Sequence, residues 1–292
     1  MKLPKIGFVG TGVMGKSMAG HLLTAGYSVM VYNRTKAKAE KLLEQGALWA
    51  ETVAMMAQSC DIIITMVGYP KDVEETYLAP SGLIAQAKAG TILIDMTTSS
   101  PLLAKKLYEA GKARDVAVLD APVSGGDVGA RQAKLSIMVG GEAKVFETAL
   151  PIFQCLGTNI VKQGGPGAGQ HTKMCNQIAI ASNMMGVCEA MAYAREAGLD
   201  PQQVLTSIAT GAAASFSLSN LAPRMLSGDQ APGFYVKHFI KDMKIALEAA
   251  AEMKLALPGL ALAKELYEQL AAAGHENSGT QALYLLYQAH NE

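Results

Sequence analysis

The chain has 292 residues, of which half are hydrophobic and 17% are charged, so it can form a large core and is long enough for two domains. Its 25 basic side chains balance 25 acidic ones without a basic stripe, which argues against a nucleic-acid partner. No apolar run is long enough for a membrane span, and the four cysteines and five histidines lack metal-site spacing. We therefore predict a cytoplasmic protein that binds no metal, membrane or nucleic acid.

A glycine-rich stretch near the N-terminus is the most informative motif. An apolar run ends at Gly10, and a helix-compatible pattern starts near Met14. Gly10, Gly12 and Gly15 fit the pattern G-x-G-x-x-G. In order, these glycines allow a tight turn, the close approach of a pyrophosphate, and the packing of the helix against the strand. A second apolar run at 28–32 completes a strand–helix–strand pattern, which favours a dinucleotide site over a turn without a ligand. The predicted cofactor loop consists of Gly10, Thr11, Gly12, Val13, Met14 and Gly15.

The end of the second strand bears on the choice of cofactor. Sites for NAD usually carry Asp or Glu there to bind the ribose 2′-hydroxyl, whereas this chain has Asn33, Arg34 and Thr35. The Arg34 guanidinium suits a 2′-phosphate, and no carboxylate stands beside it in the sequence to repel one. We therefore expect NADP to be preferred, with NAD possible; the alternative is a solvated turn with an incidental arginine.

The first half of the chain alternates strands and helices. Apolar runs at 62–67, 91–96, 116–120 and 136–141 predict further strands, and the alternation continues to about residue 164. The fold class is therefore α/β, with an N-terminal Rossmann-like, mostly parallel, doubly wound sheet. Ligands of such sheets bind at the carboxyl ends of the strands. Met66 and Val67 either line the cofactor there or belong to the core, and Thr97 lies in a hydroxyl-rich turn after the next strand.

The second half predicts no strand. Helical patterns cover about 178–197, 202–210, 238–253, 260–273 and 281–288. We predict a dinucleotide-binding domain at 1–164 and an all-α domain for substrate binding and oligomerisation at 165–292. The 178–197 segment has few polar positions, so we expect it to be buried all round, as the central helix of this domain or in a subunit interface. A homodimer or homotetramer is therefore expected.

Three further motifs contain candidate chemical groups. After the strand at 116–120, Ser124, Gly125 and Gly126 combine a hydroxyl with backbone N–H groups, which suits a substrate carboxylate, although a plain turn is the alternative. Lys173 shares a helical face with Asn176 and Gln177 and is a candidate proton donor, or else a solvated lysine in a first helical turn. The third motif, 234–243, is cationic and aromatic and by itself indicates only a charged helix start.

Together, four ordered motifs resemble those of the β-hydroxyacid dehydrogenases, over nearly the whole chain. They are the stretches 7–15, 120–126 and 167–176 and the pair Lys241-Asp242. The resemblance implies an NAD(P)-dependent oxidoreductase that interconverts a small 3-hydroxyacid and its semialdehyde. It implies Lys173 as the general acid and base, Ser124, Gly125 and Gly126 at the substrate carboxylate, Thr97 near the nicotinamide, Lys241 over the cofactor with Asp242 beside it, and Phe234 against the substrate.

One position departs from the family pattern. Many members have Asn four residues after the lysine as the substrate-binding amide, where this chain has Gln177, so either Asn176 or Gln177 is expected to orient the substrate. Two alternative functions are an imine reductase and a catalytically inactive cofactor-binding interaction module. Relatives of both kinds usually lack the lysine that this chain has at position 173.

Overall fold

A computed structural model describes residues 3–288; residues 1–2 and 289–292 lie outside the description. The chain forms two compact units, 1–173 and 174–292, and the division falls within one long helix. Each unit is described below by itself. The domain boundary predicted at 164/165 stays a prediction.

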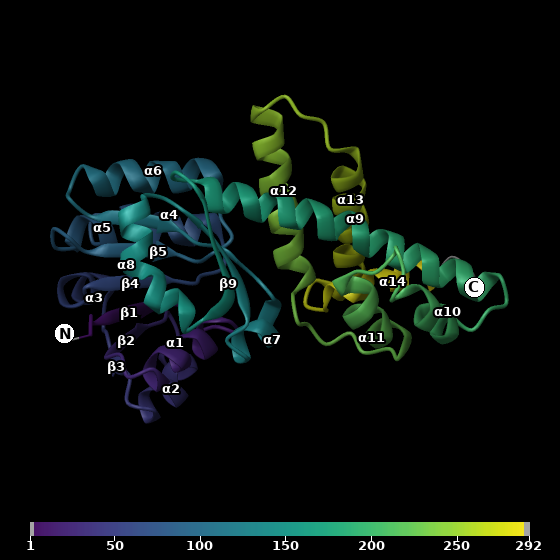
Figure 1. Ribbon diagram of the computed structural model, residues 1–292, viewed down its shortest axis with the longest axis horizontal. Helices are drawn as coiled ribbons and strands as arrows, with labels where there is room; N and C mark the ends of the chain where they lie inside the picture. Colours follow the sequence, from purple (N-terminus) through teal and green to yellow (C-terminus); the bar gives the residue numbers. More distant parts are fainter. Residues whose placement is uncertain (1–2, 289–292) are drawn as a thin grey trace. The chain divides into compact units, whose positions relative to one another are not determined.

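The first unit is built on a nine-stranded sheet (Figure 1). The strand order is β3-β2-β1-β4-β5-β6-β8-β7, with β9 also paired to β8. The pairs from β3 to β6 are parallel, whereas β8 runs antiparallel to β6 and β7. The strands are β1 Ile6–Val9, β2 Val29–Tyr32, β3 Leu48–Trp49, β4 Ile62–Thr65, β5 Ile92–Asp95, β6 Ala117–Asp120, β7 Val123–Ser124, β8 Leu135–Gly140 and β9 Gly157–Gly164.

Helices cover both faces of the sheet (Figure 1). Side chains of a strand alternate between the two faces, so Ile62 and Ile64 pack in one core while Ile63 packs in the other. The first core includes Met18 and Phe153 from helices on one face, and the second includes Tyr77 from a helix on the other. The helices of this unit are α1 Gly15–Thr24, α2 Glu40–Glu44, α3 Val53–Ser59, α4 Pro70–Leu78, α5 Leu83–Gln86, α6 Pro101–Lys112, α7 Gly126–Arg131 and α8 Ala143–Gln154, with a 3-10 helix at Lys36–Ala39.

This architecture confirms the predicted mostly parallel, doubly wound sheet. The continuous apolar runs of β4 and β5 are fully buried, as expected for parallel strands covered on both faces. Sequence patterns did not predict three strands. Two of them, β3 and β7, have only two residues each, and β9 alternates between partly buried and exposed positions because only one of its faces meets the core.

The second unit is helical, and its described residues contain no strand, only an isolated bridge between Tyr235 and Gly279. Its core centres on Phe239, which contacts Phe234 and Tyr267 edge-on. Met184, Met185 and Met191 lie in this core. The helices are α9 Ala168–Glu196, which begins in the first unit, α10 Pro201–Ile208, α11 Ala222–Leu226, α12 Val236–Glu252, α13 Pro258–Leu270 and α14 Tyr284–Gln288, with π-helical turns at Ser217–Leu221 and Ala271–His275 and a 3-10 helix at Thr280–Leu283.

The long helix differs from its prediction in two respects. It begins at Ala168, ten residues before the apolar pattern, because the polar stretch around Lys173 is helical as well. It is also not buried all round in the single chain. Exposed residues recur every three or four positions along one face, at Cys175, Ala179, Ser182, Gly186, Glu189 and Tyr193. Four of these six are Ala, Ser, Gly or Cys, so small side chains made an amphipathic helix look uniformly apolar.

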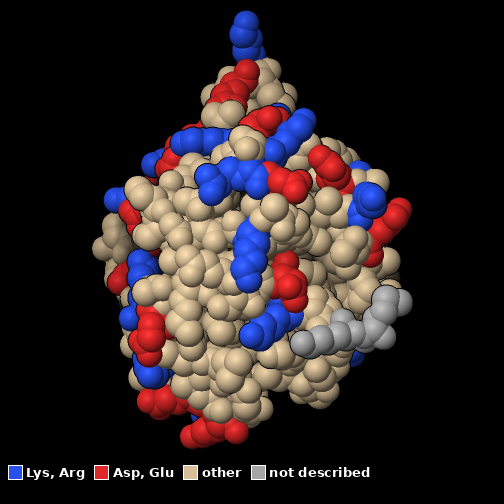
Figure 2. Space-filling view, turned by 90° about the vertical axis from the view of Figure 1, so that its left-hand side faces the viewer, with Lys and Arg blue, Asp and Glu red and all other residues tan. Residues whose placement is uncertain are grey.

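On the face shown in Figure 2, basic and acidic side chains are interspersed among uncharged ones, without a large area of one sign. Within residues 3–288, no helix combines the length and the hydropathy that a membrane span requires.

Candidate active site

The glycine loop joins β1 to α1 at the carboxyl edge of the sheet. Gly10 has φ +97°, and a β-carbon there would lie 2.2 Å from the Met66 carbonyl oxygen, so only glycine fits. At Gly15 a β-carbon would lie 1.9 Å from the Gly10 carbonyl oxygen, which shows how closely α1 meets the strand. A β-carbon on Gly12, in contrast, would meet nothing within 4 Å. The loop therefore has open space at the glycine predicted to face a pyrophosphate.

Two buried hydroxyls near this edge fit a polar ligand. Thr11 is 2% exposed and Ser99 is 1% exposed, yet the hydroxyl oxygen of each has no hydrogen-bond partner among the described residues. An unpaired buried hydroxyl is costly, and a phosphate or amide group of a bound molecule would relieve the cost. Met14, at the N-cap of α1, makes no side-chain cap, so the start of the helix keeps N–H groups suited to a phosphate. These features fit a dinucleotide.

The turn after β2 is tied to the glycine loop. The Asn33 side-chain oxygen accepts the Thr11 N–H at 3.2 Å, and its amide nitrogen donates to the Thr35 carbonyl at 2.9 Å. Arg34 extends into solvent, and its Nη1 atom lies 3.1 Å from Oδ1 of Asp72, which belongs to α4. Sequence reasoning found no carboxylate beside Arg34; the fold supplies one from 38 residues further along the chain.

The ends of β4 and β5 are joined through Thr97. Its hydroxyl accepts the Val67 N–H at 3.0 Å, and its own N–H donates to Asp95 Oδ1 at 3.1 Å. Asp95 also accepts the Thr65 hydroxyl at 2.8 Å. Burial raises the pKa of Asp95 to about 6, although these hydrogen bonds oppose the rise. Thr97, Val67 and the half-buried Met66 thus form one connected edge, and their contact with the cofactor stays a prediction.

The predicted carboxylate loop joins β7 to α7. Val123–Ser124 pairs with β8, and α7 begins at Gly126. Gly125 and Gly126 both have positive φ, at 126° and 62°, a conformation that glycine adopts without strain. Ser124 is partly buried beside them. The contact of this loop with a substrate carboxylate stays a prediction.

A buried carboxylate holds the N-terminus of α9. The Oδ1 and Oδ2 atoms of Asp120, at the end of β6, accept the N–H groups of Gly167 and Gln170, each at 2.8 Å. These N–H groups belong to the start of the helix, where no carbonyl is available within the helix. Burial raises the pKa of Asp120 to about 6, although the helix N–H groups oppose the rise. Gly169 allows the close approach, because a β-carbon there would lie 2.3 Å from the Met138 carbonyl oxygen.

Gln170 fixes the same helix to the turn after β5. Its amide nitrogen donates to the Thr97 carbonyl at 2.7 Å, and its oxygen accepts the Ser99 N–H at 2.9 Å. The side chain is fully buried, so both ends of the amide are used inside the protein. Lys173 follows three residues later and is 6% exposed. It lies in the second turn of α9, not in a solvated first turn, so its burial contradicts the reading of a solvated lysine.

The second unit contains the remaining predicted residues. Gln177 is 1% exposed; its oxygen accepts the Asn176 amide at 2.7 Å, and its nitrogen donates to Asp242 Oδ2 at 2.6 Å. The Nζ atom of Lys241 lies 3.0 Å from Asp242 Oδ1. Both ends of the Gln177 amide therefore engage protein groups. Asn176 is only partly buried, so it is the better candidate of the two for a substrate contact.

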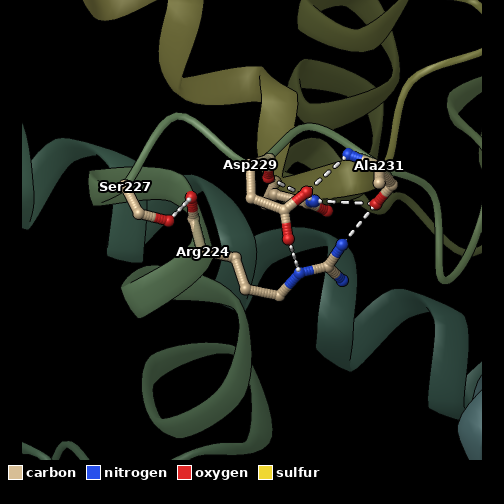
Figure 3. Close-up of polar contacts among 5 residues, drawn as sticks. Arg224, Ser227, Asp229 and Ala231 are labelled. Carbon is tan, nitrogen blue, oxygen red and sulfur yellow. Dashed lines mark hydrogen bonds and ion pairs between the residues drawn. The ribbon is translucent and has the colours of Figure 1, made fainter.

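The segment before α12, which carries Phe234, is held by a polar cluster (Figure 3). Arg224 donates through Nε to Asp229 at 2.8 Å and through Nη2 to the Ala231 carbonyl at 2.5 Å. Gln281 donates to the carbonyl groups of both Asp229 and Ala231. Phe234 follows this cluster, and its carbonyl accepts the Thr280 N–H at 3.2 Å. The position of Phe234 is therefore fixed, while its contact with the substrate stays a prediction.

Sequence reasoning assigned no role to Asp72, Asp95 or Gln170, and quoted Asp120 only as part of a motif. A signal existed for two of them. Asp95 and Asp120 each end a buried apolar strand, a position where a carboxylate needs hydrogen-bond donors from other parts of the protein.

The raised pKa of Asp120 predicts a pH-dependent stability. Its folded-state pKa of about 6 lies above the ordinary 3.8, so its contribution to stability is complete below about pH 4 and is lost as pH rises through 6. Asp120→Asn cannot titrate. We expect the wild-type advantage over this variant in free energy of unfolding to shrink by on the order of 3 kcal/mol between pH 4 and 7.5. Urea unfolding followed by circular dichroism measures it.

The variant also loses one accepting oxygen, which lowers its stability at every pH, so the trend with pH is the readout. Asp115→Asn, at an exposed position, is the control and should show little trend. A wild-type advantage over Asp120→Asn that does not change with pH would contradict the assignment.

Gln170→Leu should destabilise the chain by roughly 2–5 kcal/mol, because it leaves the Thr97 carbonyl and the Ser99 N–H buried without partners. Gln163→Leu makes the same chemical change at an exposed position of β9 and should cost less than about 0.5 kcal/mol. Chemical unfolding of both variants tests the comparison. Equal stabilities would mean that the Gln170 amide does not fix the helix.

Comparisons with known proteins identify the family. Residues 5–165 match the family model described as the NAD binding domain of 6-phosphogluconate dehydrogenase. Residues 167–287 match the model described as NAD-binding of NADP-dependent 3-hydroxyisobutyrate dehydrogenase. Both ranges together span the glycine loop, the helix that carries Lys173 and the helical unit.

Individual proteins are similar over nearly the full length. The chain is 62% identical to the uncharacterized oxidoreductase YkwC of Bacillus subtilis, over 97% of this chain and 98% of the relative. It is 38% identical to 2-hydroxy-3-oxopropionate reductase of Escherichia coli, over 96% and 95%. A solved structure of Mycobacterium tuberculosis 3-hydroxyisobutyrate dehydrogenase with L-serine matches with a TM-score of 0.90 and 27% identity, over 98% and 99%. The resemblance inferred from four motifs is thereby confirmed, and the chain belongs to the β-hydroxyacid dehydrogenase family of NAD(P)-dependent oxidoreductases.

Proposed function

We propose that this protein interconverts a small 3-hydroxyacid and its semialdehyde, with NADP preferred over NAD, and that Lys173 is the general acid and base. One observation carries the proposal. Lys173 is buried in the second turn of a helix whose start is hydrogen-bonded to the turns at the carboxyl edge of the nucleotide-binding sheet. Burial of a charged ammonium is costly, and buried ionisable groups are concentrated at functional sites, so this lysine is a candidate for a role in catalysis.

The nucleotide half is proposed to be held by the glycine loop. The open space at Gly12, the unpaired Thr11 hydroxyl and the start of α1 suit the pyrophosphate. Asn33, Arg34 and Thr35 suit the adenosine ribose, with Arg34 at the 2′-phosphate. The match of the second half to a model described as NADP-dependent supports this preference. The bound nicotinamide supplies or accepts the hydride.

The proton is moved by the protein. In reduction, the Lys173 ammonium donates a proton to the carbonyl oxygen of the substrate while the carbonyl carbon receives the hydride. In oxidation, the neutral Lys173 amine removes the proton from the substrate hydroxyl. The loop Ser124–Gly126 holds the substrate carboxylate with its N–H groups and hydroxyl. Asn176 lies three residues after Lys173 on the same helix, so its amide faces the same side and can orient the substrate. The Gln177 oxygen accepts the Asn176 amide and its nitrogen donates to Asp242, so these two residues position Asn176.

The substrate class follows from these groups and from the relatives. A carboxylate site near a single proton donor suits a short chain with a carboxylate at one end and a carbonyl at the other. One relative is named 2-hydroxy-3-oxopropionate reductase, and 2-hydroxy-3-oxopropionate is such a compound. A solved structure with a similar fold is named 3-hydroxyisobutyrate dehydrogenase, and the oxidation of 3-hydroxyisobutyrate at its alcohol carbon gives such a compound as well. We propose tartronate, methylmalonate and succinate semialdehydes, with glyoxylate, as the panel for assay.

Lys173→Met should lower the turnover number by about 10²-fold or more with any substrate of the panel, because it keeps the side-chain volume and removes the proton donor. NADPH oxidation followed by absorbance measures it, and the Kd of NADPH should change less than threefold. Lys144→Met, on the surface of α8, is the matched control and should retain full turnover. A folded Lys173→Met protein with near-wild-type turnover would refute the role.

Arg34→Gln should weaken NADPH binding by about 10- to 100-fold, since a charge-assisted contact to the 2′-phosphate is worth roughly 1.5–3 kcal/mol. NADH binding should change less than twofold. Arg114→Gln is the control, because Arg114 precedes β6 at the opposite edge of the sheet. Fluorescence titration of the two cofactors gives the values. Equal effects of Arg34→Gln on NADPH and NADH would remove Arg34 from the 2′-phosphate site.

A further inference from the structure

The ion pair between Arg34 and Asp72 crosses the predicted nucleotide site. Arg34 follows β2 and Asp72 lies in the first turn of α4, which follows β4. These two strands flank β1 on either side in the sheet. Because neighbouring strands lie about 4.8 Å apart, the pair spans the carboxyl end of β1, where the glycine loop begins. A dinucleotide on that loop would have its adenosine ribose beside this pair.

The carboxylate is the fixed member of the pair. Asp72 Oδ2 accepts the Tyr69 N–H at 3.1 Å, as part of the N-terminal cap of α4, and leaves Oδ1 for Arg34. Its side chain is 17% exposed, whereas that of Arg34 is 78% exposed. Arg34 therefore reaches toward a carboxylate that the helix start already holds in place. The interaction uses the Nη1 atom of Arg34, which is one of several donors on the guanidinium.

We propose that Asp72 determines how strongly this enzyme discriminates between NADPH and NADH, by competing with the 2′-phosphate for Arg34. This inference rests on the proposed function of Arg34. A 2′-phosphate carries nearly two negative charges at neutral pH, and beside Arg34 it would lie close to the Asp72 carboxylate. Like charges around one guanidinium repel, so Asp72 weakens NADPH binding without abolishing it, because other donors of Arg34 stay available. The uncharged 2′-hydroxyl of NADH experiences no such repulsion.

The variant Asp72→Asn isolates the charge. Asn has nearly the same shape, and its side-chain oxygen can still accept the Tyr69 N–H, so the cap of α4 is retained. We expect the Kd of NADPH to fall by about three- to tenfold at low salt, because the repulsion between the partly exposed Asp72 carboxylate and the 2′-phosphate is removed. This gain in affinity should shrink at high salt, which screens the repulsion. The Kd of NADH should stay within twofold.

The matched control is Glu75→Gln on the same helix. The Glu75 side chain is 64% exposed, and its Oε1 atom lies 3.8 Å from the Nζ atom of Lys71. It removes the same charge and should leave both Kd values within twofold.

A double-mutant cycle tests the competition itself. Asp72→Asn, Arg34→Gln and the double variant are titrated with NADPH and NADH by cofactor fluorescence, without substrate or turnover. Thermal unfolding of each variant confirms that it is folded. If Asp72 acts through Arg34, the gain in NADPH affinity from Asp72→Asn should fall to less than twofold in the Arg34→Gln background.

The outcomes separate this inference from the proposed function. If Arg34→Gln weakens NADPH but Asp72→Asn leaves it unchanged or weakens it, the competition is refuted and the role of Arg34 stands. Equal gains for NADPH and NADH, or a gain that persists in the double variant, also refute it. If Arg34→Gln leaves NADPH binding unchanged, the proposed 2′-phosphate contact fails, and the inference fails with it.

Discussion

The contact between the Asp120 carboxylate and the start of α9 is the interaction on which the catalytic proposal depends. A helix start has N–H groups with no partner in the helix, and its dipole favours a negative charge nearby. Asp120 meets both requirements from the end of β6, at 2.8 Å from each of two N–H groups. Gln170 adds two hydrogen bonds to the turn after β5. The first turn of α9 is thereby joined to two adjacent strand ends, and Lys173 follows in the next turn.

Several buried carboxyl and hydroxyl groups lie at the carboxyl edge of the same sheet. Asp95 and Asp120 end neighbouring strands, and burial raises the pKa of both toward neutrality. Asp95 accepts a hydrogen bond from the turn that follows β5, and Asp120 accepts two from the start of α9, so neither carboxylate is left unpaired. The unpaired hydroxyls of Thr11 and Ser99 lie in the same loop system. In the proposed function, these two hydroxyls form hydrogen bonds with the bound nucleotide.

Local motifs were sufficient to predict the strand–helix junction at the glycine loop and the parallel sheet, and they singled out Lys173, whose catalytic role stays a prediction. In each case the information lies within a few residues, as in the spacing of Gly10, Gly12 and Gly15. The contacts of Asp120, Gln170 and Asp72 could not be predicted, because their partners lie 38 to 73 residues away and only the fold brings them together. The long helix is not buried all round within the single chain, which the sequence did not indicate because its exposed face consists largely of small residues that do not register as polar. Asp72 matters most among these residues. A preference for NADP was expected from Arg34 alone, and the Arg34–Asp72 ion pair places a carboxylate beside the proposed 2′-phosphate site.

Chemical rescue of Lys173→Ala tests the central claim, that the side chain at this position transfers the proton. The truncation leaves space for a small primary amine, and the buried site restricts which amines can enter. The account predicts that methylamine or ethylamine restores semialdehyde reduction in proportion to its concentration. The rescued rate should depend on the pKa of the added amine, as expected for a general acid. A folded Lys173→Ala protein that binds NADPH normally, yet gains no activity from any small amine, would contradict the account.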